Sequence, residues 1–322
     1  TRPGDGRVTI NSTSGTGTAA TEGAGSTITA EELLLLGAGD FTLDQANDVA
    51  TLAANGTGAI NYHDANGFTV GTVGATVGIN ATAADGDVSL TTDTDGTAGS
   101  AEITLSEDIQ TDGGDVTLTA IVDVDGNRTI DTENVNDAAG SVLITGVVNA
   151  LLDETDTLAI DASGTTDGAV ELQSSVGATV APGELTVTGG QIDLQNVTVS
   201  GANAASGGIS VTGSTDIDLN GTDYQVTGGT SDDPILFTGA VTLNNDVTVQ
   251  GGGTAGDNVT FSSTVDSEGA ERSLDVLADN ADITIQGDVG ASSALSALTI
   301  GDANTDNVEI NDIGTAGQDG VS

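Results

Sequence analysis

Five oxygen-bearing side chains in the segment 123–133 could bind a metal ion. They are Asp123, Asp125, Asn127, Asp131 and Glu133. Carboxylate and amide oxygens are the ligands that Ca²⁺ accepts, and Gly126 predicts a turn among them. The spacing departs from the D-x-[DN]-x-[DN]-G loop because this glycine comes too early, and the G-G-x-G-x-D repeat is absent. A solvated turn and a calcium site both remain open, and calcium is the one cofactor that the sequence suggests. Shorter acidic runs at 92–96 and 232–233 are weaker candidates.

Residues for catalysis are scarce. His63 is the only histidine. The alternation around it puts Ile60 and Tyr62 on one face of a strand and His63 on the other, so we expect an exposed histidine. A pair of His63 and Asp64 lacks the further ligands that a zinc site needs. With 49 acidic residues some carboxylate pair fits any glycosidase distance by chance, and Arg128 is the only base beside an acidic cluster for a lyase. The sequence therefore predicts that the protein is not an enzyme.

Charge and composition exclude several classes of protein. The 322 residues hold 49 acidic residues, 4 arginines and no lysine, which gives a net charge of −45. A polyanion repels nucleic acids and anionic lipids, so we expect no nucleic-acid partner and no membrane insertion. The absence of cysteine excludes a disulfide scaffold and thiol-bound metals. The charge fits solubility in salty water, where counterions screen the repulsion, and it also fits clusters that collect Ca²⁺.

Short apolar pairs with one residue between them recur along the whole chain. This period of two is typical of a very short strand with one buried face, and the Gly, Asn, Asp and Ser residues between the pairs favour turns. The clearest pairs are Val88/Leu90, Val116/Leu118, Leu185/Val187, Ile209/Val211, Ile217/Leu219, Ile235/Phe237, Val241/Leu243, Val247/Val249, Val259/Phe261, Ile283/Ile285 and Val308/Ile310.

The spacing of these pairs predicts the architecture. From Leu185 similar pairs begin at 209, 235, 259, 283 and 308, and in the first half they begin at 60, 88, 116 and 142. Three short strands in each period of 24–28 residues indicate an all-β parallel β-helix, or β-solenoid, of about 12 coils. A sandwich or barrel of hairpins is the alternative, but the uneven loops favour the solenoid. We expect residues 1–322 to form one continuous solenoid segment of a longer chain, with irregular coils at 143–184, where the register is lost.

The segment 29–36 contains four consecutive leucines and could start a helix, because Thr29 and Glu32 would form a capping box. Gly37 and Gly39 would end such a helix after eight residues. Leu33 lies 27 residues before Ile60, which is in phase with the coils. We therefore predict a strand for this segment.

Several stretches resemble a known family. The segments 30–43, 47–55 and 60–73, the run Gly114-Asp-Val-Thr-Leu-Thr-Ala120 and the run Val259-Thr-Phe-Ser-Ser-Thr-Val265 are similar to the β-strand repeats of large bacterial exoproteins related to filamentous haemagglutinin. The resemblance covers nearly the whole chain and carries no catalytic signature. It implies a right-handed β-helical shaft of a secreted or surface-bound adhesin. The secretion domain that precedes the repeats in that family has no recognisable counterpart here.

Two functions follow as hypotheses. The first is a structural extracellular protein, the rigid shaft of a cell-surface adhesin or fibre, without catalysis. Its partners would be neighbouring repeats of the same chain or identical copies end to end, together with host or matrix glycans or proteins. The second is a glycan-binding or polysaccharide-cleaving β-helix, which would need a groove lined by aromatic and basic residues. The aromatic residues fall mostly on inward positions of the expected strands, so the sequence favours the first.

Overall fold

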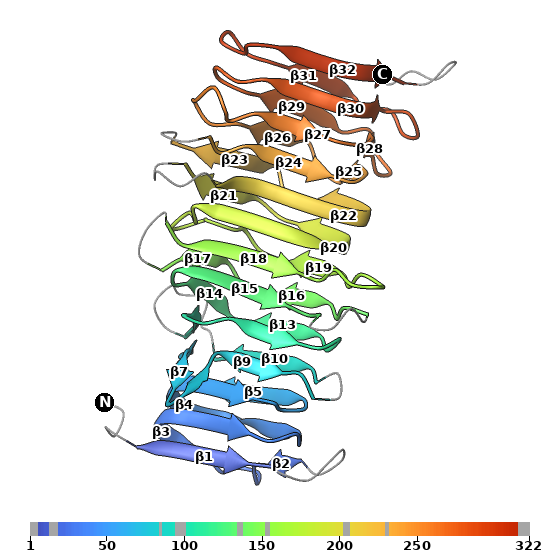
Figure 1. Ribbon diagram of the computed structural model, residues 1–322. Helices are drawn as coiled ribbons and strands as arrows, with labels where there is room; N and C mark the ends of the chain where they lie inside the picture. The colour runs from blue at the N-terminus through green and yellow to red at the C-terminus, as the bar shows by residue number, and fades with distance from the viewer. Residues whose placement is uncertain are drawn as a thin grey trace. The chain divides into compact units, whose positions relative to one another are not determined.

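The computed structural model describes residues 6–12, 19–83, 86–93, 101–133, 138–151, 155–201, 207–228 and 232–314. These residues form strands and no helix, and the fold is an all-β parallel β-solenoid of about 11 turns (Figure 1), one fewer than the sequence predicts. The chain divides into two compact units. The first unit comprises 1–151 and 158–169, and the second comprises 152–157 and 170–322.

The first unit is built from short strands joined by turns. Its strands are β1 (Arg7–Asn11), β2 (Ala20–Thr21), β3 (Thr29–Leu36), β4 (Phe41–Asn55), β5 (Ile60–Asp64), β6 (Phe68–Val70), β7 (Thr72–Val73), β8 (Thr76–Val77), β9 (Ile79–Ala81), β10 (Val88–Thr92), β11 (Glu102–Leu105), β12 (Ile109–Thr111), β13 (Val116–Thr119), β14 (Ile121–Val124), β15 (Asn127–Asp131), β16 (Val142–Ile144), β17 (Val148–Ala150) and β18 (Thr157–Asp161).

The second unit repeats this construction. Its strands are β19 (Val170–Leu172), β20 (Glu184–Leu194), β21 (Val197–Ser200), β22 (Gly208–Leu219), β23 (Asp223–Thr227), β24 (Ile235–Thr238), β25 (Val241–Leu243), β26 (Val247–Gln250), β27 (Val259–Phe261), β28 (Val265–Ser267), β29 (Ser273–Leu277), β30 (Ile283–Val289), β31 (Ala297–Ile300) and β32 (Val308–Ile313).

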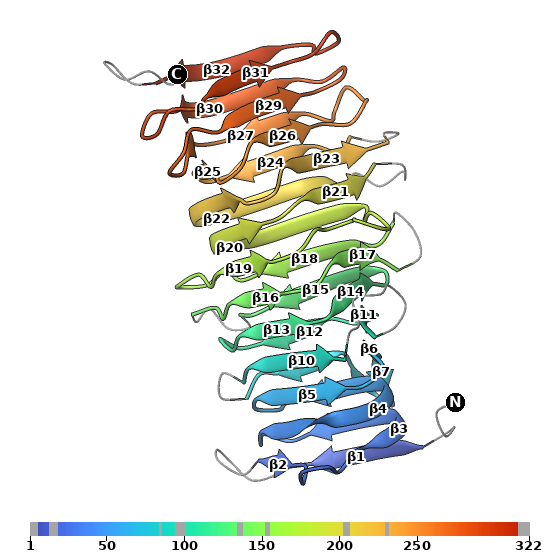
Figure 2. The ribbon, with the colours of Figure 1, turned by 180° about the vertical axis from the view of Figure 1, so that it is seen from behind.

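Successive turns pair in parallel and in register. In the second unit β24, β25 and β26 make one turn, and they pair with β27, β28 and β29 of the next turn (Figures 1 and 2). The predicted openings at 185, 209, 235, 259, 283 and 308 pair in that order, and those at 60, 88, 116 and 142 do so in the first unit. Three strands per turn and the period of the repeat are therefore confirmed.

The core of each unit consists of the inward side chains of the apolar pairs. Most of these side chains are between 0% and 2% exposed, and the last pair is the exception, with Val308 47% exposed. All six aromatic residues lie inside their unit, with exposures between 0% and 3%. The rings of Phe237 and Phe261 stack at a centroid distance of 5.1 Å, and Tyr224 meets Phe237 edge-on at 6.2 Å. Equal positions in successive turns thus form ladders of touching side chains.

The predicted strand at 29–36 is confirmed, but its phase was wrong. Leu33 pairs with Val8 and Leu52, whereas Ile60 pairs with Phe41 of β4. The reason is the length of β4, whose 15 residues pair with β5, β6 and β9 and so contribute to three columns of strands, with a register shift between Leu43 and Asn47. Four strands, β3, β4, β20 and β22, are longer than the very short strands that the sequence predicts, because they continue around a corner.

The four leucines of β3 bury side chains on both faces of the sheet. Leu33 and Leu35 point into the core and are 0% exposed. On the outer face Leu34 packs with Ala53 and Val73, which belongs to the antiparallel hairpin of β7 and β8. This hairpin shields apolar surface that a regular turn would leave in water.

The irregular spacing between 142 and 185 has a local cause in the second unit. Val170 pairs with Ile192, only 22 residues later, whereas the predicted period is 24–28 residues. The apolar pair that begins at Ile192 is the second half of β20, and the pair at Leu185, in the first half, belongs to another column of strands. Within the described residues no helix is long and apolar enough to cross a membrane.

Replacing Phe237 by alanine should lower the free energy of unfolding of the second unit by ~3–5 kcal/mol, because the change removes a fully buried ring and leaves a cavity. The neighbouring Leu236, on the outer face, provides the matched control, and Leu236→Ala should cost less than about 1.5 kcal/mol. Urea denaturation followed by circular dichroism measures both values. Equal losses for the two variants would contradict the inward assignment of Phe237.

Candidate functional site

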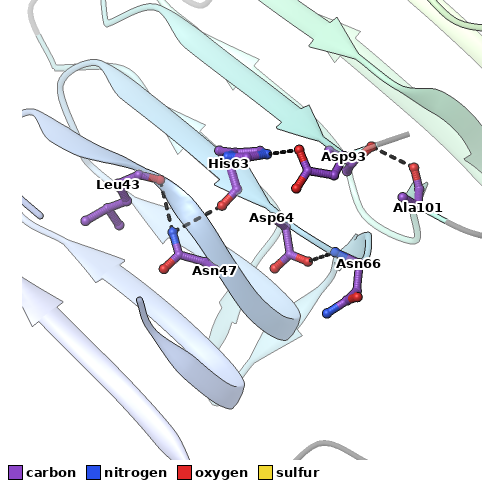
Figure 3. Close-up of polar contacts among 8 residues, drawn as sticks. Leu43, Asn47, His63, Asp64, Asn66, Asp93 and Ala101 are labelled. Carbon is purple, nitrogen blue, oxygen red and sulfur yellow. Dashed lines mark hydrogen bonds and ion pairs between the residues drawn. The ribbon is translucent and has the colours of Figure 1, made fainter. Parts of the chain in front are cut away.

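The single histidine lies on the outer face of β5. Its Nε2 atom is 2.8 Å from Oδ1 of Asp93, which follows β10 of the next turn (Figure 3). The side chain of His63 is 22% exposed and that of Asp93 is 60% exposed. The predicted outward direction is therefore confirmed, although the histidine is less exposed than expected because it lies against the next turn. An ion pair this close to water contributes little to stability.

Asp64 points the opposite way, into the core. It is 0% exposed, and its carboxylate accepts hydrogen bonds from Val49 N at 2.8 Å, Tyr62 Oη at 2.7 Å and Asn66 N at 2.9 Å (Figure 3 draws the last). Three donors compensate the loss of water around a buried carboxylate. Since His63 and Asp64 lie on opposite faces of β5, they cannot hold one metal ion between them.

Asn47 fills the corner where β4 changes register. Its Nδ2 donates to Leu43 O and to His63 O, both at 3.1 Å (Figure 3), and its Oδ1 accepts from Ile28 N at 2.6 Å. The side chain is 0% exposed. It satisfies backbone groups that the bulge after Leu43 takes out of the ladder. The polar residues around His63 are thus arranged to hold a corner of the solenoid.

The substitution Asp64→Ala should destabilise the first unit by ~3 kcal/mol or more, because three donors would lose their acceptor in the core. The control Asp93→Ala removes only the exposed partner of His63 and should cost less than about 1 kcal/mol. Thermal and urea unfolding of both variants test this difference. If Asp64→Ala lowered the free energy of unfolding as little as Asp93→Ala does, the prediction would be wrong, and water would have to accept these hydrogen bonds instead.

The first of the predicted calcium ligands, Asp123, is buried between two turns. It is 9% exposed and lies on the outer face of β14, where it forms side-chain hydrogen bonds with Glu102 and Asn149. Burial and the neighbouring Glu102 carboxyl raise the pKa of Asp123 from 3.8 to about 7. At neutral pH this carboxyl is partly protonated, and a metal ion would have to displace the proton before it could bind.

The other predicted ligands have different neighbours. Asp125 accepts a hydrogen bond from Ser106 Oγ at 2.8 Å, and Asp131 accepts one from Gln110 Nε2 at 3.4 Å. Burial raises the pKa of Asp131 as well. The side chain of Asn127 is exposed, and Glu133 donates its backbone N–H to Asp131 Oδ1 at 3.0 Å.

The turn at Gly126 divides this segment between two strands. Gly126 has φ of 80°, and it joins β14 and β15, which stand in different columns of strands. Arg128 lies beside it, with its Nη1 at 3.4 Å from Glu107 Oε2 and 3.9 Å from Asp108 Oδ1. Across the residues that the structure describes, no three His, Cys, Asp or Glu side chains gather as a metal site. The calcium site stays a prediction.

Of the two weaker acidic runs, the structure describes 232–233 in full and 92–96 only in part. Asp233 is 1% exposed, and its Oδ1 accepts a hydrogen bond from Gly207 N at 2.7 Å while its own N donates to Asp257 Oδ1 at 2.8 Å. Asp257 is also buried, at 0% exposure. These two carboxylates cap backbone N–H groups at one corner of successive turns. The run at 92–96 lies outside the described residues from position 94 onward.

The second unit has an acidic groove that sequence reasoning missed. Its volume is about 460 Å³. It is lined by Gln191, Asp216, Asp218, Thr242, Asp266, Ser267, Glu268, Gly269, Ser292 and Ser293. The carboxylates come from different turns and are brought together by the register, since Asp193 pairs with Asp218 and Asp218 with Thr242. To find these carboxylates from the sequence, one would need to know which residue of the next turn pairs with each outward residue.

The groove changes the acidity of one of its residues. Burial, followed by repulsion from Asp216, Asp193 and Glu268, raises the pKa of Asp218 from 3.8 to about 6. Gln191 Nε2 donates a hydrogen bond to Asp218, and Thr242 Oγ1 donates one to Asp216 at 2.9 Å. No aromatic or basic residue lines the groove, so it can attract cations but offers no ring for stacking on a sugar.

The raised pKa of Asp218 predicts a pH dependence. Folding favours its protonated form, so the stabilisation from this group is complete below pH 3.8 and is lost as the pH rises through about 6. Asp218→Asn cannot titrate and should become more stable than the natural chain above pH ~7, by roughly 1–2 kcal/mol. The exposed Asp306→Asn, which removes one carboxylate outside the groove, is the control. Urea unfolding across this pH range measures both, and a constant difference for Asp218→Asn would contradict the prediction.

Calcium binding at 123–133 predicts a stabilisation that Na⁺ cannot supply. The melting temperature should rise with millimolar Ca²⁺ as RT ln(1 + [L]/Kd) and should hardly change with Na⁺ at equal ionic strength. Asp125→Asn should remove this response. An equal rise with both salts would assign the effect to screening of the net charge of −45 and would rule out a specific site.

The fold and the side chains together define the class of protein, a parallel β-solenoid with a polar, anionic outer face. Comparison with family models, with curated protein sequences and with solved structures finds no match to this chain.

Proposed function

We propose that this chain is a structural segment of an extracellular protein, a shaft that separates other parts of a cell-surface adhesin or fibre and performs no catalysis. The observation that carries the proposal is the uniformity of the turns. From Ile209 to Ile283 successive turns place an apolar pair at the same inward position and bind one another through parallel, in-register hydrogen bonds. A structure of this kind gains stability with every added turn and can be lengthened without a new core.

The side chains support a structural role. The capping carboxylates Asp233 and Asp257 and the inward Asp64 accept hydrogen bonds from backbone N–H groups of neighbouring turns. Arg128 joins the side chains of Glu107 and Asp108. The resemblance of the repeats to exoproteins related to filamentous haemagglutinin supports the surface location and the adhesin context. In this proposal the partners are neighbouring repeats of the same chain or identical copies placed end to end.

Glycan binding is the alternative, and the acidic groove of the second unit is its best candidate location. A sugar ring binds proteins by stacking on aromatic side chains as well as by hydrogen bonds. All six aromatic rings of this chain are buried in the core. The groove therefore offers hydrogen-bonding groups alone, and its carboxylates would repel an acidic polysaccharide.

Antibodies raised against the purified chain test the proposal on cells of the source organism. We expect them to label intact cells, and brief treatment of those cells with a protease should remove the label. Labelling that requires permeabilised cells would overturn the extracellular role. In parallel, a glycan array and a lyase assay with acidic polysaccharides should both be negative, and cleavage of a polysaccharide would overturn the structural assignment.

A further inference from the structure

Three Asn–Gly pairs occur in the chain, at 55–56, 66–67 and 220–221. Glycine has no Cβ, so it leaves the backbone nitrogen that follows an asparagine unusually accessible to the asparagine side chain. The solenoid places the three pairs in different surroundings. Because the three pairs have the same two residues, a difference in their reactivity comes from the structure around them.

Asn55 is the last residue of β4, and its side chain is exposed and has no hydrogen-bond partner among the described residues. Gly56 has φ of 65°, and no heavy atom lies within 4 Å of the position that a Cβ would take. The Gly56 N–H donates to no backbone oxygen of the described chain. Both reacting groups of this pair are therefore free to move.

The other two pairs are held in place. Gly67 is buried and packs closely against the backbone of Glu102. Its backbone nitrogen therefore cannot move toward the side chain of the exposed Asn66. At the third pair, Gly221 N donates to Tyr224 Oη at 3.0 Å and to Leu194 O at 3.2 Å. The Asn220 carboxamide is also engaged.

That carboxamide belongs to a ladder. Asn220 Nδ2 donates to Asp193 Oδ1 at 3.2 Å, and Asn220 Oδ1 accepts from Asn244 Nδ2 at 2.8 Å. Reaction at this pair would first have to break these bonds together with those of Gly221. Local opening of this kind is rare within a well-packed turn.

We propose that Asn55 is a site of spontaneous chemical modification, deamidation through a cyclic imide. The Gly56 nitrogen loses its proton to water and bonds to Cγ of Asn55, and the Cγ–Nδ2 bond breaks so that ammonia leaves with a proton. Water then opens the five-membered imide at either carbonyl and leaves an aspartate or an isoaspartate at position 55. The reaction consumes one water, releases one ammonia and needs no other reactant.

The modification changes the first unit at a paired position. Asn55 stands opposite Leu36 on one side and Asn80 on the other. Each event adds one negative charge to a chain that already carries −45, and an isoaspartate inserts an extra methylene into the backbone at the end of β4. The fraction of chains modified at position 55 therefore increases with the time that the protein has been folded.

Peptide mass mapping tests the proposal on the purified full chain, kept folded in mildly alkaline buffer. A protease that cleaves before aspartate separates the three pairs into the peptides 48–63, 64–84 and 218–222. Deamidation of 48–63 is counted as the intact peptide with the mass gain where isoaspartate forms, and as the new fragments 48–54 and 55–63 where aspartate forms. In the folded chain we expect its total rate to be at least about tenfold above that of the other two peptides, counted in the same way. In urea all three peptides should gain mass at similar rates.

Two variants assign the reaction. Asn55→Ser should abolish the mass gain of 48–63, and because this side chain is exposed the variant should fold. Gly56→Ala should slow the reaction both in the folded chain and in urea. A folded chain in which 64–84 or 218–222 reacts as fast as 48–63, or in which 48–63 reacts only in urea, would overturn the proposal.

Discussion

The in-register parallel pairing of each turn with the next is the interaction on which the rest of the structure depends. It satisfies the backbone N–H and C=O groups of short strands that could not be stable alone. It also aligns equal positions of successive turns, so Phe237 meets Phe261 and Ile235 meets Val259. Small aliphatic pairs can then form a continuous core, and the chain needs only six aromatic residues, all of them inside.

The same register acts on polar residues and has two consequences. At corners it brings a carboxylate or carboxamide under the backbone of the next turn, as with Asp233 and Asp257, and the side chain becomes a cap. On the outer face it brings like charges together, as with Asp193 and Asp218, and burial followed by this repulsion raises the pKa of Asp218. Whether a carboxylate stabilises or strains the fold is therefore decided by its position in the turn.

Much of the fold could be predicted from the sequence because the inward pairs have a period of two and recur at a nearly constant distance. The openings from 185 to 308 and from 60 to 142 could be placed on this basis alone. Three features could not be predicted in this way. Strands that continue around a corner, such as β4 and β20, contain apolar residues that belong to different columns. The hairpin of β7 and β8 is the one antiparallel pairing among the residues that the structure describes. The acidic groove depends on which outward residues become neighbours, and one residue of register shift changes every neighbour.

The predicted calcium segment shows which residues become spatial neighbours in a solenoid. Asp123 and Asp125 are close to Asp131 in sequence, but the turn at Gly126 sends β14 and β15 into different columns, and each side chain meets residues about 20 positions away instead. In a compact loop, sequence neighbours are also spatial neighbours, and a ligand motif can be read along the chain. In a solenoid the spatial neighbours of an outward residue are those one turn before and after it. A search for binding sites in such a protein therefore has to compare residues that are one period apart. By that criterion Asp193 and Asp218 are neighbours, and Asp266 stands in the same column beyond Thr242.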